Sequence, residues 1–322
     1  MINSTAIIYN QTEILWAAVI ILLAILSWFN LSLALYKSKK ASKAALWVFL
    51  PISLFFSFLL CRIIYWYSHR PQFEGLWDCL VSRDLSAFSL VGLLPGIVLA
   101  ALLIRAFHMI PHTMRFLDAL SAPTAFGTGL LCLTCLFNNT FRGKNLITDP
   151  AFRKLPFGAA NAGAGGVEYR YAEFFVGFLM MSLIGIIMIN VYRTMKKQKG
   201  ITFCIFLLLF SGAEFYLDSV RYDAGYFPFN GFVSIFQIAA AIAIMGVTVY
   251  FSIRAVKRTS FRGIYILLWI LELAAFAATG FLEYLVQRHG DKAVMLYFIM
   301  GAGLLCMILF PCILCSMGNK KK

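Results

Sequence analysis

Charged residues are scarce in this sequence. They make up 13% of the 322 residues, whereas 61% are hydrophobic. Because an ordinary water-soluble domain is only about half apolar, this composition excludes a soluble globule and indicates an integral membrane protein. The net charge of +14 does not indicate a nucleic-acid binder, since almost no Lys or Arg interrupts the apolar runs.

Histidine is also scarce. His69 and His289 fall in expected outer loops, and His108 and His112 fall in an expected cytoplasmic loop. No histidine lies in an apolar run beside a serine or an acid, which removes the usual general base and the commonest transition-metal ligand from the interior. The sequence also lacks a glycine-rich loop that could cradle a phosphate. It therefore predicts no metal and no cofactor.

Cysteine is present but is not arranged as a disulfide framework. Seven of the eight cysteines lie in apolar runs, where Cys behaves as a small apolar residue, and only Cys79 lies in an outer loop. The pairs Cys132/Cys135 and Cys312/Cys315 have the spacing of redox or zinc motifs. Neither pair has a neighbouring histidine or a polar turn, so packing is favoured over redox or metal chemistry.

Long apolar runs dominate the remainder. About 20 apolar residues cross a bilayer as a helix, and the sequence predicts an all-α polytopic membrane helical bundle with about nine transmembrane helices. The expected spans are 13–36, 45–67, 87–107, 117–138, 172–192, 201–219, 231–253, 264–286 and 293–316. This count leaves no room for a soluble catalytic domain, so any chemistry takes place in or beside the bilayer.

The basic residues predict an orientation. Most of them cluster in the loops that one side of the membrane would share: Lys37, Lys39, Lys40, Lys43, Arg105, Arg115, Arg193, Lys196, Lys197, Lys199, Arg254, Lys257, Arg258, Arg262, Lys320, Lys321 and Lys322. Because basic loops stay in the cytoplasm, we expect the N-terminus outside and the C-terminus in the cytoplasm. The first run lacks a basic n-region and is interpreted as a retained span.

Three charged residues stand out because charge is costly inside a membrane. Glu214, Asp218 and Arg221 follow one another at i, i+4 and i+7 in the sixth expected span, which places them on one helical face. Asp218 and Arg221 can pair, which leaves Glu214 deeper. The pattern fits a functional site and, equally, a clamp that orients one helix against another.

Other features allow two interpretations each. Arg62, followed by Tyr65, Trp66 and Tyr67, suits a bound phospholipid phosphate or an arginine that reaches the interface within an aromatic belt. The Gly/Ala-rich stretch 158–166 suits a lid or, preferably, a linker.

Three more acids lie in or beside the apolar runs. Glu173 follows Arg170 by three residues, which favours an interfacial ion pair. Glu272 and Glu283 share one face of the eighth expected span and have no visible basic partner, so we expect them to be protonated.

Several motifs, taken in order, resemble those of the bacterial prolipoprotein diacylglyceryl transferases. Leu60 to Tyr65 is similar to that family's Gly-x-Arg-Leu/Ile-x-Tyr, and Trp77-Asp78 precedes Phe88 as a Trp-Asp precedes the family's Ser-Phe-His-Gly-Gly. The stretch Leu131 to Gly143 is similar to the signature Gly-Arg-Leu-Gly-Asn-Phe-Ile-Asn-Gly-Glu-x-x-Gly. The sixth span is similar to Arg-x-x-x-Glu-x-x-Arg, and Glu173 matches the acid that opens the fifth.

The sequence departs from these motifs at charged positions. Ser89 replaces the histidine, Cys132 the signature arginine and Glu214 the first arginine of the sixth-span motif, whereas Asn138, Gly143 and Arg221 are retained. Arginines in such a site would bind the lipid phosphate and stabilise the departing glycerol phosphate. An anionic headgroup is therefore expected to bind less well here than in the typical family member.

The resemblance implies a function and its residues. It implies transfer of the diacylglyceryl group of phosphatidylglycerol to the lipobox cysteine of a preprolipoprotein, at the outer face of a bacterial cytoplasmic membrane. The implied catalytic residues are Glu214, Asp218 and Arg221, and the implied lipid-phosphate-binding residues are Arg62, Asn138, Arg142 and Gly143. It also implies a seven-helix domain over residues 1–255, followed by two additional helices over 256–322 with a basic tail.

Two other classes of function remain open. The motif losses favour a catalytically degenerate relative that binds a lipid or a lipoprotein, with Glu214, Asp218 and Arg221 purely structural. The intramembrane acids, including Glu272, also suit a small transporter or channel, although the sequence shows no inverted repeat or broken helix.

Overall fold

A computed structural model of the chain describes residues 5–9, 12–36, 44–82, 88–138, 140–163, 166–195, 198–225, 233–259, 263–288 and 293–319. The chain forms two compact units. Unit 1 comprises Met1–Phe206 and Val220–Gly225, and unit 2 comprises Leu207–Ser219 and Tyr226–Lys322. Helix α7 (Ile201–Val220) therefore contributes to both units.

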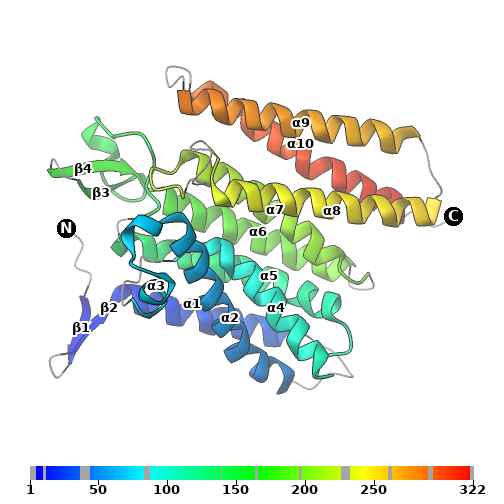
Figure 1. Ribbon diagram of the computed structural model, residues 1–322, viewed down its shortest axis with the longest axis horizontal. Coiled ribbons are helices and arrows are strands. Elements are labelled where there is room, and N and C mark those ends of the chain that lie inside the picture. Colours follow the sequence, from blue (N-terminus) through cyan, green and yellow to red (C-terminus); the bar gives the residue numbers. More distant parts are fainter. Residues whose placement is uncertain are drawn as a thin grey trace. The chain divides into compact units, whose positions relative to one another are not determined.

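The expected membrane architecture is confirmed. Among the described residues, eight helices are long and apolar enough to cross a membrane. They are α1 (Trp16–Leu35), α2 (Ala44–Ser68), α5 (Thr113–Asn138), α6 (Glu173–Met195), α7, α8 (Ile235–Thr259), α9 (Gly263–Arg288) and α10 (Ala293–Asn319) (Figure 1).

The third expected span is shorter than predicted. Helix α4 (Leu93–Ala106) has 14 residues, which at about 1.5 Å per residue extends roughly 21 Å, less than the ~30 Å hydrocarbon layer. Gly96 lets α4 approach α2 closely, because a Cβ there would lie 2.5 Å from Ser57 Cα. The apolar run 87–107 is thus a short helix packed on its neighbour.

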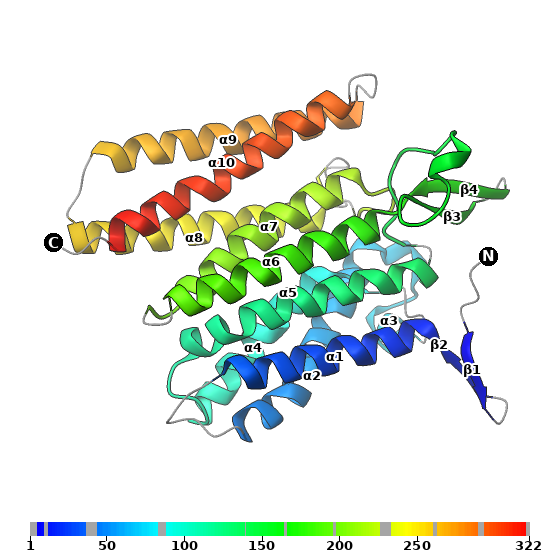
Figure 2. The same ribbon diagram turned by 180° about the vertical axis from the view of Figure 1, so that it is seen from behind.

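Helix α5 is the centre of unit 1. It packs against both α1 and α6, while α2 packs against α4 (Figure 2). Trp28 Nε1 of α1 donates a hydrogen bond of 3.2 Å to Thr124 Oγ1 of α5, and both side chains are buried. A cavity of about 80 Å³ opens beside this pair and is lined by α1, α2, α4 and α5, including Ser57 and Thr128.

Two hairpins and a short helix were not predicted as such. Strands β1 (Thr5–Tyr9) and β2 (Thr12–Leu15) pair antiparallel, so α1 begins at Trp16 rather than at residue 13. Strands β3 (Gly158–Gly163) and β4 (Gly166–Tyr171) also pair antiparallel. The linker interpretation of 158–166 is therefore wrong. Helix α3 (Leu76–Val81) buries Cys79.

A buried carboxylate fixes the start of α7 within unit 1. Asp118 of α5 is 4% exposed. Its Oδ2 accepts the N–H of Gly200 at 2.7 Å, and its Oδ1 accepts the N–H of Phe203 at 2.8 Å. These are N–H groups that a helix start leaves without an intrahelical acceptor, so Asp118 acts as a cap supplied by another helix.

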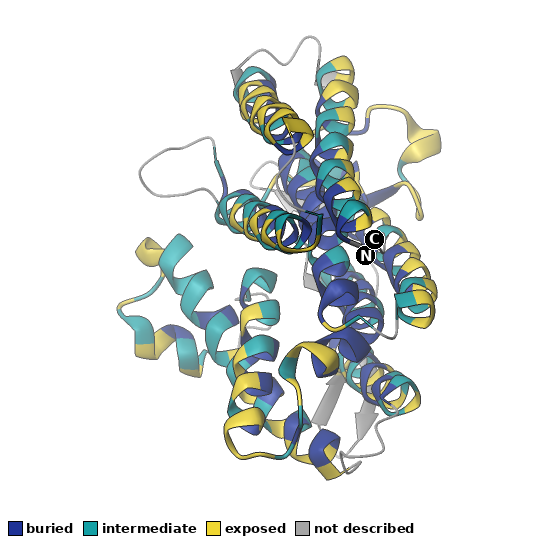
Figure 3. Cartoon of the chain, turned by 90° about the vertical axis from the view of Figure 1, so that its right-hand side faces the viewer, coloured by how far each residue is buried: buried dark blue, intermediate teal, exposed yellow. Residues whose placement is uncertain are grey.

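In unit 2, helices α8 and α9 both pack against α10. The predicted domain boundary near residue 255 stays a prediction. In the structure, α8 belongs to unit 2 together with α9 and α10. The outward positions of α9 are apolar and exposed, among them Ile266, Leu267 and Ile270 (Figure 3). Exposed apolar helix faces are what contact with lipid requires.

Candidate functional site

Three segments distant in the sequence are hydrogen-bonded together in unit 1. The segment after α5 pairs with β4, since Gly143 N–H donates to Tyr171 O at 3.0 Å. The same segment pairs with the last residue of α7 and with the residues after it: Lys144 N–H donates to Val220 O at 2.9 Å, and Tyr222 N–H donates to Arg142 O at 2.7 Å. This pairing brings Arg142, Gly143 and Arg221 together.

Gly143 occupies a position where a Cβ would be tightly packed. A Cβ there would lie 3.1 Å from Tyr171 Cβ and 3.2 Å from Glu173 Oε1. The close approach places the Glu173 carboxylate, at the start of α6, directly against the Gly143 backbone. The structure thus gives Gly143 a packing role, while its predicted role in phosphate binding stays a prediction.

Arg142 carries a buried guanidinium. The residue is 2% exposed, its Nη2 donates to Leu136 O at 3.1 Å, and its guanidinium lies 4.7 Å from the centre of the Phe174 ring. Within the described part of the chain, its Nε and Nη1 have no hydrogen-bond acceptor. Burial lowers the pKa of Arg142, and nearby Cys135 and Asp223 act in the opposite direction. A buried arginine remains charged and therefore favours an anionic partner.

Arg221 is held by an acid that follows it closely. Its Nε and Nη2 each donate to one Asp223 carboxylate oxygen at 3.2 Å, and its guanidinium lies 4.4 Å from the Phe141 ring centre. Burial raises the pKa of Asp223, but the Arg221 charge and the hydrogen bonds from Arg221 and Phe141 N–H outweigh it, so this pKa lies below its ordinary value. Arg221 is thus oriented on both sides.

Phe141 has a strained backbone at this point. Its φ is 56°, a left-handed conformation that bulky residues rarely adopt. The conformation aims its N–H at Asp223 Oδ2, at 2.8 Å, and its C=O at Phe174 N–H, at 3.1 Å. Strain of this kind costs on the order of 1–3 kcal/mol and persists only where surrounding contacts hold it.

A third arginine links the segments. Arg170 Nη1 donates to Lys144 O at 2.6 Å, and its guanidinium lies 3.9 Å from the Tyr222 ring centre. Its ion pair in the structure is with Glu168, at 2.9 Å, rather than with Glu173 as expected. We call Arg142, Arg170 and Arg221 the arginine cluster.

Arg62 is placed by other elements of unit 1. It lies in α2, is 2% exposed, donates from Nη2 to Ser82 O at 2.9 Å and stacks on Phe88 at 4.3 Å. This burial contradicts the interpretation of an arginine that reaches outward to the interface. Its backbone carbonyl also accepts the Cys79 thiol at 3.6 Å, and burial raises the pKa of Cys79.

The predicted helical face of three charges is not continuous. Glu214 and Asp218 lie in α7, in the part that belongs to unit 2, and both are buried. Helix α7 ends at Val220, and Arg221 forms a β-bridge with Gly143 in unit 1. Arg221 is therefore presented by extended backbone. Asn138 ends α5, and its side chain lies outside the described residues.

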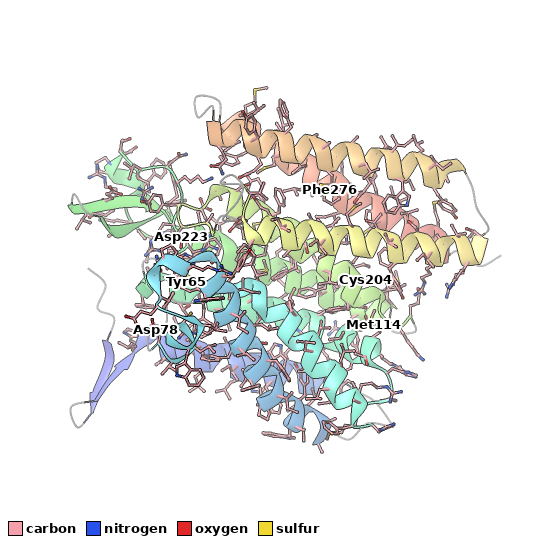
Figure 4. All side chains as sticks on the ribbon, in the orientation of Figure 1. Tyr65, Asp78, Met114, Cys204, Asp223 and Phe276 are labelled. Carbon is pink, nitrogen blue, oxygen red and sulfur yellow. The ribbon has the colours of Figure 1, made fainter. Side chains whose placement is uncertain are left out.

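Two residues next to this cluster were not predicted as site residues. The sequence did not single out Asp223, and it placed His69 only in an outer loop. Figure 4 shows Asp223 and Tyr65 at the same end of the unit 1 helices, opposite Met114. The spacing of Tyr65 and His69 at i and i+4 at the end of an apolar run was the available signal, because it stacks two rings on one helical face.

Unit 2 contains a separate polar network. Ser219 Oγ donates to Glu283 and accepts from Gln237 Nε2 at 3.0 Å, and Gln287 Nε2 donates to Glu283 at 2.8 Å. Glu272, one of the acids without a visible basic partner, accepts from Thr248 Oγ1 at 3.3 Å. The described residues include no group of three His, Cys, Asp or Glu side chains that could hold a metal.

The fold and the site define a multi-pass membrane protein whose unit 1 brings three arginines together, of which Arg142 and Arg170 are buried. Residues 5–253 match the family model described as prolipoprotein diacylglyceryl transferase, so the chain belongs to this family. No curated protein matches the chain. The matched range ends within α8, and α9 and α10 lie beyond it.

Proposed function

We propose that the protein transfers the diacylglyceryl group of phosphatidylglycerol to the lipobox cysteine of a preprolipoprotein, at the outer face of a bacterial cytoplasmic membrane. Arg142 carries the proposal: it is a buried cation whose Nε and Nη1 have no acceptor within the described residues. A phosphate oxygen is the kind of acceptor that a guanidinium binds best.

The proposed reaction is a displacement at carbon. The cysteine sulfur forms a bond to the glycerol carbon that bears the phosphate, the C–O bond breaks, and glycerol phosphate leaves with the electron pair. Arg142 and Arg221 would bind the phosphate and stabilise the charge on the leaving group. Asp223 takes two of the five N–H donors of Arg221, which fixes the plane of its guanidinium.

Unit 1 also has an apolar cavity between its helices. The cavity of about 80 Å³ is lined by Trp28, Ser57, Leu93 and Thr128, among others, and has room for only a small part of an acyl chain. Arg62 is the third candidate for the phosphate. Glu214 and Asp218 stay predictions as catalytic groups, as does the placement of the N-terminus outside.

The test is a reaction in liposomes of phosphatidylglycerol with a lipobox peptide, read by mass spectrometry for a diacylglyceryl adduct on the cysteine. We expect an adduct with the wild type and its loss with Arg221→Ala. Arg153→Ala is the matched control, because Arg153 hydrogen-bonds Thr148 O in the loop rather than a residue of the cluster. Phosphatidylethanolamine liposomes test the preference for an anionic headgroup.

The replaced motif residues favour a second function, a binding protein without catalysis. Cys132 and Glu214 stand where the family pattern has arginines, which leaves fewer cations for a leaving phosphate. Peptide binding without an adduct, while an intact family enzyme labels the same peptide, would support this alternative and contradict the transferase proposal.

A further inference from the structure

His69 lies immediately after α2 and is held in one orientation. Its ring stacks on Tyr65, with ring centres 4.1 Å apart and an angle of 11° between the planes. Tyr65 in turn packs edge-on against Phe73 at 6.1 Å. The imidazole therefore has a defined plane and a fixed pair of nitrogen positions.

The contacts of Nδ1 indicate which nitrogen carries the proton. Nδ1 lies 3.2 Å from Tyr65 O and 2.8 Å from Ser68 Oγ, and Ser68 Oγ lies 2.9 Å from the same carbonyl. A carbonyl only accepts, and the Ser68 hydroxyl has one proton, which it donates to a carbonyl. With the Ser68 proton on a carbonyl, Nδ1 is the donor and the lone pair of the neutral ring is on Nε2; this assignment follows from the hydrogen-bond network.

His69 lies close to the residues that follow Arg221. A Cβ at Gly225 would be 3.5 Å from Ser68 Cβ, so the segment 221–225 contacts the end of α2. The charged groups that act on the imidazole from this segment are Asp223 and Arg221, with opposite effects. Burial lowers the pKa of His69 below its ordinary value, the Asp223 carboxylate raises it and the Arg221 guanidinium lowers it. At neutral pH the ring is a neutral base.

We infer that Nε2 of His69 accepts the proton of the lipobox thiol during diacylglyceryl transfer, an inference that rests on the proposed function. The S–H bond breaks as Nε2 gains the proton, the thiolate forms the S–C bond, and the C–O bond to phosphate breaks. The imidazolium then returns its proton to the departing glycerol phosphate or to water. Asp223, nearby, stabilises the transient imidazolium.

The experiment compares wild type, His69→Gln and His112→Gln in the adduct assay across pH. Removal of a general base costs about 10²–10⁴-fold in rate, so we expect a loss of at least ~10²-fold for His69→Gln. The wild-type rate should fall as pH drops through a value below 6.5, the ordinary pKa of histidine, and His69→Gln should lose this dependence. His112, which contacts Lys199, is the matched control.

A second substrate separates a base from a merely structural residue. A lipobox peptide with selenocysteine in place of cysteine is already ionised at neutral pH, so the defect of His69→Gln should shrink with it. An equal defect with both peptides would overturn the inference, as would a His69→Gln enzyme as fast as wild type. A wild type that forms no adduct would instead contradict the proposed function itself.

Discussion

Both units bury ionisable side chains, but Arg142 and Arg170 in unit 1 lie on non-helical backbone, whereas the buried acids Glu272 and Glu283 of unit 2 lie within a helix. In unit 2 the acids accept from neutral donors, Glu283 from Ser219 and Gln287, and Glu272 from Thr248. The second carboxylate oxygen of Glu272 has no hydrogen-bond partner among the described residues. In unit 1, Arg142 has one backbone acceptor and two nitrogens without an acceptor among the described residues. A buried carboxyl can become neutral by binding a proton, whereas a buried guanidinium stays charged and therefore favours an anionic ligand.

The largest expected effect is a separation of activity from stability at Arg142. Arg142→Met keeps most of the side-chain volume and removes the charge, so adduct formation should fall by about 10²–10³-fold, as for loss of one stabilising donor. The unfolding temperature should not fall, because replacing a buried charge by an apolar residue is often neutral or stabilising. A parallel loss of activity and stability would remove the distinction between the units.

Loss of an acid in unit 2 should have the opposite signature. Glu283→Ala removes the carboxylate that accepts from the Gln287 amide and leaves the buried Ser219 hydroxyl with only the weak acceptor Met300 Sδ. This should lower the free energy of unfolding by about 1–3 kcal/mol. Activity per folded molecule should stay at the wild-type level. Chemical denaturation measures the change, and Ser316→Ala, at an exposed serine bonded within its own helix, is the control.

Replacement of a structural acid in unit 1 should lower stability, as expected at Glu283, and not activity alone, as expected at Arg142. Asp118→Ala removes the acceptor of two N–H groups at the start of α7 and should cost about 1–2 kcal/mol of stability, the range for loss of a helix cap. Asp149→Ala removes an exposed cap of one N–H at 2.9 Å and should cost less. Equal costs in thermal unfolding would show that burial of Asp118 adds nothing.

The smallest expected effect concerns the pH dependence of Asp223. Because its folded pKa lies below the ordinary value of 3.8, ionised Asp223 stabilises the folded state above 3.8, and this stabilisation is lost as pH falls through the lower folded pKa. The carboxylate is 29% exposed, so the contribution should stay below about 1 kcal/mol. The free energy of unfolding of Asp223→Asn, measured at a series of pH values, should not show this loss at acid pH. A steeper loss of stability in the variant than in the wild type would contradict the prediction.

The comparison also separates what local pattern predicts from what it does not. The apolar runs placed the helices within a few residues, because a span must satisfy its backbone internally and present apolar side chains to lipid. The β3–β4 hairpin was missed, because Gly and Ala carry no strand signal and its pairing depends on a partner. Residues 87–107 were predicted as a full span because hydropathy alone does not show that helix α4 begins only at Leu93.

The site was only partly accessible to sequence. The motif order singled out Arg62, Arg142, Gly143 and Arg221, but it assigned Arg221 to a helical face with Glu214 and Asp218. Helix α7 ends at Val220, one residue before Arg221, because the backbone of residues 220–222 pairs with that of residues 142–144. Such pairing between segments about 80 residues apart has no local sequence signature, since it depends on loop closure.

The amino-acid sequence by itself determined that this protein is a helical membrane protein with charge confined to a few positions, because hydropathy acts residue by residue against the same solvent. Only the tertiary structure decided what those charges meet. It left Arg142 buried with two nitrogens unsatisfied within the described residues and paired Arg221 with Asp223. It also placed His69 beside residues 221–225. The reason is physical: the effect of a buried charge depends on its distance to its neighbours, and those distances exist only once the chain has folded.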